Sequence, residues 1–464
     1  MLHPHLWPDT ATLSQDGHLV IGGCDTVALA RNHGTPLYLL DEATFRACCR
    51  AYRTACARQY PGPAVVHYAS KALLTTAVAQ LVAEEGLGLD VVSGGELYVA
   101  LRAGFPAQRM HLHGNAKPRA ELEQALEAGI GTIVVDSLDE LDLLARLTTG
   151  RVAPQAIMLR LSPGITADTH AHIETGSAGS KFGLPLAALD AAAARLAATP
   201  GLRLAGLHAH LGSQILDPAP IVRAIAVLLD CAARLRDRHA ILVDAISPGG
   251  GLGVPYTPAQ PTPDLESYVA AVGGALQSGC VARGLPLPRL VLEPGRSIVA
   301  RAGVAVYEII ATKPLTDEGT PAQDEHPAID PLRPSAAVRY LHVDGGMADN
   351  IRPALYGARY TALLANRASA QPEEIVHVAG RYCESGDVLL RDVALPRAGP
   401  GDLLAVAVAG AYTLSMASTY NLVPRPALLL VGDGRARVIQ RRETYADLAA
   451  RDMPLADQPA TSTS

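Results

Sequence analysis

The chain has 464 residues, of which 49% are hydrophobic and 18% are charged, and its formal net charge is −6. This composition excludes an intrinsically disordered chain, and the length is sufficient for two globular domains. The mild acidity, with no basic stripe interleaved with aromatic side chains, gives no support for nucleic-acid binding.

Neither the cysteines nor the N-terminus indicates export or membrane insertion. The seven cysteines are odd in number and lack CxxC spacing, so disulfide frameworks and zinc ribbons are disfavoured. The N-terminus lacks the basic start and hydrophobic core of a signal peptide, and no apolar run reaches the roughly 18 residues needed to span a bilayer. We therefore expect a soluble, cytoplasmic protein that binds no membrane.

Residues 36–300 alternate between apolar β-type runs and stretches with helical periodicity. Two such helical stretches are Leu74 to Val82, after the first run, and Ile221 to Leu235, after the sixth. Eight strands with intervening helices predict an α/β fold with a (β/α)8 TIM-type barrel. The first strand is not followed by GxGxxG, which weakens the alternative of an open dinucleotide-binding sheet. The predicted strands are 64–70, 87–92, 110–113, 132–135, 156–161, 203–209, 241–246 and 289–293.

Residues 1–35 and 301–464 are predicted to form a second, mostly β domain. After residue 301, strand-like runs are separated by Gly and Pro turns, with little helical periodicity. The polar segment 316–336 is expected to be a solvated surface loop, and the tail 459–464 is expected to fray. The predicted strands are 18–21, 304–311, 338–343, 375–379, 403–409 and 426–431.

Lys71 is the first candidate catalytic residue. The chain has only four lysines among its 39 Lys and Arg residues, and Lys71 directly follows the first predicted barrel strand. A lysine amine can lose its proton and attack a carbonyl, whereas a guanidinium stays protonated. Residues that follow barrel strands gather at the catalytic face. Taken alone, Lys71 could equally be an ordinary surface lysine.

Two segments after the seventh and eighth strands favour a phosphate site. Gly249, Gly250 and Gly251 follow the seventh strand, and glycine backbone N–H groups can approach an anion with no Cβ in the way. The eighth strand ends in Glu293-Pro294-Gly295-Arg296. A glycine triplet alone is more often a plain turn. In barrels, however, the loops after strands seven and eight often bind phosphate.

The sixth strand ends in a His-x-His pair, His208 and His210, followed by Ser213. The pair could ligate a metal, or consist of one packed and one exposed histidine, or place an imidazole against an aromatic cofactor whose phosphate Ser213 binds. No Asp, Glu or Cys set completes a metal shell, so we expect no metal and favour stacking. With Lys71 as the amine and Glu293 facing the ring nitrogen, the set suits pyridoxal 5'-phosphate.

Several segments resemble the type III decarboxylases of the alanine-racemase fold, and within them the diaminopimelate decarboxylase family. The resemblance runs from about residue 35 to residue 452, with the motifs in order in both domains. Two departures flank functional positions: Leu73 stands where the family often has Asn, and Arg381-Tyr382 where Gly-Pro-x is common. The segments are 68–72, 206–214, 247–253, 293–296, 344–347, 352–356, 383–387 and 410–416.

The resemblance implies a role for each matching position. Lys71 would hold pyridoxal phosphate, His210 would stack on its ring, and Glu293 would face the ring nitrogen. The family forms homodimers with shared active sites, in which Cys383 would reach the neighbouring subunit's site as the catalytic acid. The implied cofactor-binding residues are Lys71, Asp90, His210, Ser213, Gly249, Gly250, Gly251, Glu293, Gly295, Arg296 and Tyr412, and the implied substrate-binding residues are Arg296, Arg352, Tyr356, Glu384 and Tyr412.

The substrate-binding residue types fit meso-2,6-diaminopimelate, which carries a second amino-acid end. Arg296 and Arg352 can grip the distal carboxylate as planar forks, with help from the Tyr356 hydroxyl, and Glu384 can take the ammonium. The expected reaction is decarboxylation at the D-centre to L-lysine and CO₂, the last step of lysine biosynthesis. For Arg352, a surface arginine is the alternative.

Three other functions are compatible with parts of this pattern. The first is decarboxylation of ornithine, arginine or a carboxylated polyamine. The second is a catalytically inactive regulator of a partner decarboxylase, which would be expected to lack Lys71 or Cys383. The third is amino-acid racemisation, which would not call for the segment Cys383-Glu384-Ser385.

Overall fold

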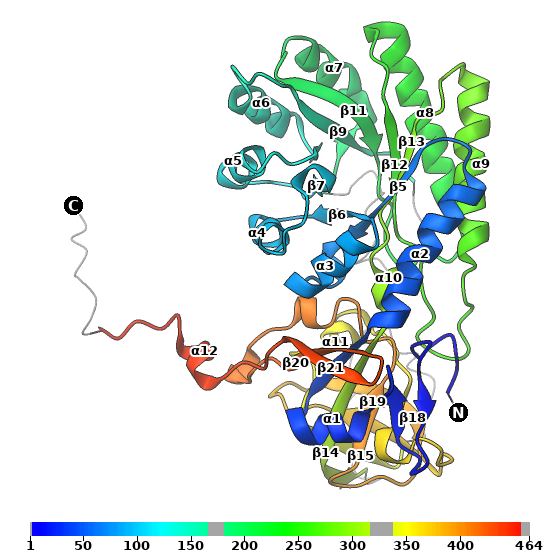
Figure 1. Cartoon of the computed structure of the whole chain (residues 1–464), viewed down its shortest axis with the longest axis vertical. Helices are drawn as coiled ribbons and strands as arrows, with labels where there is room; N and C mark the ends of the chain where they lie inside the picture. The colour runs from blue at the N-terminus through cyan, green and yellow to red at the C-terminus, as the bar shows by residue number, and fades with distance from the viewer. Residues whose placement is uncertain (1, 166–180, 316–336, 456–464) are drawn as a thin grey trace.

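The computed structural model describes residues 2–165, 181–315 and 337–455 (Figure 1). The predicted surface loop 316–336 and the predicted frayed tail 459–464 lie outside these ranges. Within the described ranges, none of the helices has both the length and the apolar composition that crossing a bilayer requires.

Eight parallel strands close into a barrel, which confirms the predicted fold class. Each strand pairs with the next in the order β5-β6-β7-β8-β9-β11-β12-β13, and β13 pairs back with β5. A short strand, β10 (Leu184–Pro185), extends β9 on one side. The barrel strands are β5 (Ala64–Ala69), β6 (Gly88–Val91), β7 (Met110–Leu112), β8 (Thr132–Val135), β9 (Gln155–Ser162), β11 (Leu202–His208), β12 (Ala245–Gly249) and β13 (Arg289–Leu292).

Helices surround the barrel and cover its strands (Figure 1). Both predicted helical stretches are confirmed: α3 buries Val78, Leu81 and Val82, and α8 buries a stripe from Ile221 to Leu235. Apolar side chains at helical spacing face the barrel, which is why these segments are helices. The helices are α2 (Glu42–Gln59), α3 (Thr76–Glu84), α4 (Gly94–Arg102), α5 (Arg119–Glu127), α6 (Leu138–Leu147), α7 (Leu189–Ala197), α8 (Ala219–His239), α9 (Leu265–Arg283) and α10 (Arg296–Val299).

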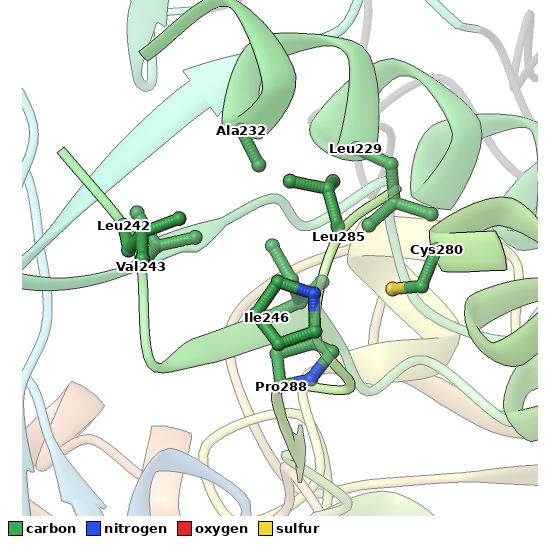
Figure 2. Close-up of a pocket in the computed structure, with 9 residues that line it drawn as sticks. Leu229, Ala232, Leu242, Val243, Ile246, Cys280, Leu285 and Pro288 are labelled. Atoms are coloured by element: carbon green, nitrogen blue, oxygen red, sulfur yellow. The ribbon is translucent and has the colours of Figure 1, made fainter. Parts of the chain in front are cut away.

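The seventh barrel strand begins later than predicted. The apolar run 241–246 indicated a strand, but β12 starts at Ala245 and continues to Gly249. Leu242 and Val243 instead surround a small apolar gap of about 10 Å³ together with side chains of α8 and α9 (Figure 2). Val243 is partly buried against the core, whereas Leu242 stays 57% exposed, and the strand extends into the glycine triplet.

The second sheet is mostly antiparallel and joins distant parts of the chain. Its order is β18-β17-β15-β14-β4-β20-β21, with β19 also paired to β14 and β16 paired to β19. The predicted strands at 304–311, 338–343, 375–379, 403–409 and 426–431 all correspond to observed strands. The strands are β14 (Gly303–Pro314), β15 (Arg339–Val343), β16 (Ala362–Leu364), β17 (Glu374–Ala379), β18 (Val388–Leu395), β19 (Leu403–Val406), β20 (Ala427–Gly432) and β21 (Arg435–Gln440).

Strand β4 (Leu37–Asp41) belongs to this second sheet, although its residues were predicted within the barrel domain. It pairs antiparallel with β14 and parallel with β20. All five residues are buried, and a continuous buried run does not reveal from sequence which sheet it joins. The N-terminal residues add a small sheet and a helix beside it: β1 (Thr12–Leu13), β2 (Leu19–Ile21), β3 (Cys24–Asp25) and α1 (Thr26–His33).

The two sheets meet at the ends of the barrel strands. The backbone N–H of Tyr412 and the hydroxyl of Ser415 both donate to the carbonyl oxygen of Ala72, which follows β5. The short helices α11 (Arg352–Tyr356) and α12 (Tyr445–Ala449) belong to the β-rich part. Residues of both parts therefore face the same space between the ends of the barrel strands and the β-rich part.

Candidate active site

One cavity of about 420 Å³ lies where the barrel strand ends meet the β-rich part. Its size is typical of a small-molecule site. The structure brings nine of the predicted site residues together on its walls, from segments more than 300 positions apart in the chain. These are Lys71, Asp90, His210, Ser213, Glu293, Arg296, Arg352, Tyr356 and Tyr412.

Lys71 lies on a single 3-10 turn, Ser70–Ala72, directly after β5. The Ser70 hydroxyl is 2.5 Å from both the carbonyl oxygen of Asp90 and Oε2 of Glu96, and Glu96 also accepts from the backbone N–H of Val92. These contacts tie the turn to the end of β6. Lys71 itself is exposed and lines the cavity, so its amine is accessible there.

The glycine triplet has a packing role at the end of β12. Gly249 and Gly251 have φ of +80° and +100°, values that favour glycine. A Cβ on Gly250 would collide with the carbonyl oxygen of Glu293. None of the three glycines is among the residues that line the cavity. The close packing of β12 and β13 thus accounts for the triplet, and its contact with a phosphate stays a prediction.

Glu293 is a buried carboxylate at the floor of the cavity. The Ser247 hydroxyl donates to Glu293 Oε1 at 2.6 Å, and His208 Nε2 lies 3.0 Å from Glu293 Oε2. Burial alone would raise the pKa of Glu293, but His208 and His113 hold that pKa well below its usual value. Glu293 is therefore a carboxylate anion in the folded protein.

Asp90 forms the second buried carboxylate of the floor, within a group of histidines. His67 Nδ1 is 3.1 Å and His113 Nε2 is 3.4 Å from Asp90 Oδ1. Burial acts to raise the pKa of Asp90, but His113 and His67 outweigh it and lower the pKa to about 2. The ring of His111 stacks on that of His67, with centroids 3.8 Å apart and planes 30° apart.

This histidine group brings two sets of potential metal ligands close together, namely His67, Asp90 and His111, and His111, His113 and Glu293. In the first set, the stacked imidazoles direct their nitrogen lone pairs in nearly parallel directions, whereas a bound ion needs lone pairs that converge. We therefore interpret His67 and His111 as part of a polar floor beside the Asp90 carboxylate, and the absence of a metal stays a prediction.

Arg296 and Arg352 lie together on another wall, each only 6% exposed. Both Nε and Nη2 of Arg296 donate to the Ser213 hydroxyl, at 3.2 and 3.0 Å, and Arg352 Nη1 donates to the Tyr360 hydroxyl. The Tyr412 ring faces the Arg296 guanidinium, 4.7 Å from Cζ to centroid. Neither arginine forms an ion pair with a carboxylate in the part of the chain that the structure describes.

Cys383 and Glu384 are both exposed and are not among the residues that line the cavity of their own chain. The loop that carries them is fixed: the Cys383 N–H donates to Asn421 Oδ1 at 3.1 Å, and the Tyr420 hydroxyl donates to Glu384 Oε1 at 2.7 Å. The buried Asp387 carboxylate accepts from the Tyr382 N–H at 2.8 Å. These two predicted residues are thus presented outward.

Sequence reasoning missed several residues of the site. Those on the cavity walls follow or end barrel strands, so the rule that found Lys71 could have found His113 and Arg160 as well. Tyr256 and Tyr360 lie behind the arginines, and no local pattern marks them. His208, which was singled out from the sequence together with His210, lines the cavity as well, and the further residues on its walls are Ala69, Val92, His113, Gly114, Asn115, Arg160 and Phe182.

Comparison with known proteins identifies the family. Residues 43–300 match the family model described as the pyridoxal-binding domain of the pyridoxal-dependent decarboxylases. The chain is 42% identical to the diaminopimelate decarboxylase of Halalkalibacterium halodurans over 448 residues, covering 96% of this chain and 98% of that one. It is 41% identical to that of Mycobacterium tuberculosis over 459 residues, covering 97% and 98%. The chain belongs to the diaminopimelate decarboxylase family.

Solved diaminopimelate decarboxylases share the whole fold. The enzyme from M. jannaschii in complex with L-lysine superposes with a TM-score of 0.86 at 32% identity, covering 97% of this chain and 99% of that one. The enzyme from Helicobacter pylori, also complexed with L-lysine, gives a TM-score of 0.80 at 31% identity, covering 92% and 98%. The agreement spans both the barrel and the β-rich part.

The cofactor of this decarboxylase family is pyridoxal phosphate, and the cavity residues fit it. The cofactor has three parts that need partners: an aldehyde, a ring nitrogen and a phosphate. The cavity offers the amine of Lys71, the buried carboxylate of Glu293 and the hydroxyls of Ser213 and Tyr412. Each part therefore has a chemically matched group among the residues that line the same cavity.

Proposed function

We propose that this protein decarboxylates meso-2,6-diaminopimelate at its D-centre, with pyridoxal phosphate as cofactor, to form L-lysine and CO₂. This is the last step of lysine biosynthesis. Membership of the diaminopimelate decarboxylase family supports the reaction, as do the L-lysine complexes of the two solved relatives.

The observation that carries the substrate assignment is the arginine pair. A buried guanidinium is costly unless an anion compensates it. Arg296 and Arg352 are buried on the cavity wall without a carboxylate partner among the described residues, and Nε of Arg352 has no hydrogen-bond partner there. The distal carboxylate of diaminopimelate supplies the missing anion, with Tyr356 beside it. The side chains of ornithine and lysine end in an amine and have no such group.

The residues around the cofactor each perform one task. Bound pyridoxal phosphate supplies an aldehyde that links to an amino group and a ring that takes up the electrons left behind by CO₂. Lys71 anchors the cofactor and later releases the product. Glu293 holds a proton at the ring nitrogen. Burial, followed by the nearby charge of Lys71, lowers the pKa of His210 well below its usual value, so His210 would offer a neutral imidazole to the cofactor ring.

The phosphate and substrate ends are held by a second set of residues. Ser213 and Tyr412 line the cavity and would hold the phosphate, together with the backbone of Gly249, Gly250, Gly251, Gly295 and Arg296 as the family pattern implies. Asp90 supports the ring from the floor of the cavity. Arg296, Arg352 and Tyr356 bind the distal carboxylate, and this fixes which of the two substrate centres reaches the cofactor.

Cys383 and Glu384 act, in this proposal, in the cavity of a second copy of the chain within a homodimer. Their outward presentation on a fixed loop supports this arrangement. Cys383 donates the proton that replaces CO₂, and Glu384 binds the distal ammonium. All seven cysteines are unpaired, which fits a reducing compartment such as the cytoplasm.

The experiment is a substrate panel with the purified holoenzyme. CO₂ release is measured from meso-diaminopimelate, L-ornithine, L-lysine and L-arginine. We expect release from meso-diaminopimelate alone, with L-lysine as product. Arg352→Met is expected to raise KM for meso-diaminopimelate at least tenfold, since the loss of a charged hydrogen-bond partner costs about 1.5–3 kcal/mol. Lys71→Ala is expected to lose both activity and the visible absorbance of lysine-bound cofactor.

Each rival function predicts a different result from this panel. A higher kcat/KM for ornithine or arginine would replace the substrate assignment. A protein that releases no CO₂ from any of the four, yet binds the cofactor through Lys71, would be a regulator. Racemisation of an amino acid without CO₂ release would assign the protein to the racemases.

A further inference from the structure

We infer that Tyr256 is a positioning residue that holds Arg296 and Arg352 in one orientation, so that both guanidinium groups bind the same carboxylate. The inference rests on the carboxylate subsite proposed above. Tyr256 follows the glycine triplet after β12 and is itself 4% exposed. It is not among the residues that line the cavity, so it acts on the substrate only through the two arginines.

Tyr256 contacts both guanidinium groups in different ways. Its hydroxyl accepts a hydrogen bond from Arg296 Nη1 at 2.5 Å. Its ring faces the guanidinium of Arg352, with Cζ 4.4 Å from the ring centroid. A hydroxyl oxygen and the negative face of an aromatic ring both attract a cation. One side chain thus attracts two like charges that would otherwise repel each other in a buried setting.

The Tyr256 side chain is itself held from the β-rich part. Its ring packs edge-on against that of Tyr360, with centroids 5.1 Å apart and planes 80° apart, and Tyr360 accepts from Arg352. The Tyr256 carbonyl accepts from the Thr361 hydroxyl at 2.9 Å. Arg296 comes from the barrel, whereas Arg352 comes from the β-rich part. Tyr256 therefore fixes the spacing of two cationic side chains, one from the barrel and one from the β-rich part.

Electrostatics agree with this arrangement. Burial alone would raise the pKa of the Tyr256 phenol, but the charges of Arg296 and Arg352 lower it below its usual value. The two guanidinium groups therefore dominate the surroundings of this phenol. A neutral phenol cannot fully compensate two cations, so the pair keeps its affinity for an incoming anion.

The test compares two ligands that differ by one carboxylate. L-lysine keeps the carboxylate of the distal end of the substrate, and pentane-1,5-diamine is lysine without it. Dissociation constants of both are measured from the visible spectrum of the holoenzyme. Tyr256→Phe removes only the hydroxyl, so we expect about tenfold weaker lysine binding, the scale of one charged hydrogen bond. Diamine binding is expected to stay within about twofold.

Tyr268→Phe is the matched control, because Tyr268 is also buried but its hydroxyl has no hydrogen-bond partner among the residues that the structure describes. It is expected to change neither constant. Thr361→Val removes the bond that fixes the Tyr256 backbone, and it is expected to weaken lysine selectively without altering Tyr256 itself. This second variant keeps the test available if Tyr256→Phe does not fold.

Three outcomes distinguish a failure of the role of Tyr256 from a failure of the proposed carboxylate subsite. Unchanged lysine affinity in Tyr256→Phe, with weakened affinity in Arg352→Met, would overturn the role of Tyr256 alone. Equal weakening of lysine and the diamine would mean that Tyr256 is merely structural. Unchanged lysine affinity in Arg352→Met would instead overturn the carboxylate subsite itself.

Discussion

The chemistry of this site depends on two buried carboxylates to which no lysine or arginine of the described ranges is bonded. Glu293 is stabilised as an anion by the Ser247 hydroxyl and by His208. Asp90 is stabilised by His67 and His113. Imidazoles and a hydroxyl satisfy the carboxylate oxygens but carry less charge than a guanidinium. The Glu293 carboxylate can therefore still interact strongly with a cationic ring nitrogen.

Glu293→Gln is the residue-scale prediction. The amide keeps the shape but cannot hold a proton at the ring nitrogen, so kcat is expected to fall by about 100-fold or more, as when a preorganised electrostatic group is lost. Ser247→Ala removes one supporting hydrogen bond and is expected to lower kcat by less than tenfold. Steady-state decarboxylation measures both, with the visible spectrum as a check on cofactor content. Wild-type kcat in Glu293→Gln would exclude this role.

Reasoning from the residues alone reached positions that follow barrel strands, whereas Arg352, Tyr356, Cys383, Glu384 and Tyr412 were predicted only from the family resemblance. Lys71, Glu293 and Arg296 could be predicted because a strand end determines its own place at the barrel mouth. Tyr256 and Tyr360 could not, because their role depends on a contact between segments about a hundred positions apart. His67 and His111 read as ordinary strand residues, since only the closed barrel brings them to Asp90.

At the scale of elements, a buried aspartate connects β4, β14 and the loop after β15. Asp349 is 2% exposed, and Tyr38 of β4 and Tyr307 of β14 donate to its Oδ1 at 2.8 and 2.6 Å. The Gly346 N–H donates to Oδ2 at 2.9 Å. Burial nevertheless raises the pKa of Asp349 to about 6. This carboxyl group connects β4 and β14 to the loop that leads into α11, and α11 carries Arg352.

The raised pKa of Asp349 gives a pH dependence with a definite sign. Between pH about 4 and 6, Asp349 binds more protons in the folded state than in the unfolded state. Its protonation therefore stabilises the fold at low pH, and this contribution to the free energy of unfolding is lost as pH rises through that window. The full loss is about 3 kcal/mol for a shift of two units, and about 2 kcal/mol of it falls between pH 4.5 and pH 7. In Asp349→Asn this decrease should be absent. Urea unfolding at pH 4.5 and pH 7 measures this decrease, with Asp16→Asn at an exposed position as control. If the free energy of unfolding changes equally between the two pH values in wild type and in Asp349→Asn, the prediction is contradicted.

Element prediction from sequence succeeded where apolar residues form continuous runs or follow a helical period. The barrel strands are continuous buried runs, the stripes of α3 and α8 follow the helical period, and both kinds of element were found. The strands β16, β18 and β21 were missed. Strand β21 is a largely exposed edge strand rich in arginine, so its sequence carries little of the apolar pattern that marks a strand. No strand was predicted at residues 37–41, which were placed in the barrel domain, because pairing partners distant in sequence leave no local signal.

At the scale of the whole molecule, the proposed site is complete only if two chains meet. Lys71 lines the cavity, whereas Cys383 is exposed on a loop that does not line it. A shared site in a homodimer reconciles the two positions, because a two-fold axis would bring the loop of each chain to the cavity of the other. The arrangement predicts how two inactive variants should behave when mixed.

Lys71→Ala lacks the cofactor anchor and Cys383→Ala lacks the acid, so each variant alone should show at most about 1% of wild-type activity, the scale of a lost general acid. In a mixed dimer, one cavity has Lys71 from one chain and Cys383 from the other, and the second cavity has neither. Random mixing gives half mixed dimers, and we therefore expect about one quarter of wild-type activity. Activity is measured after the two variants are unfolded together and refolded, with size-exclusion chromatography to establish the dimer. If the mixture stays as inactive as its components while wild type refolds fully, Lys71 and Cys383 do not act across a shared interface.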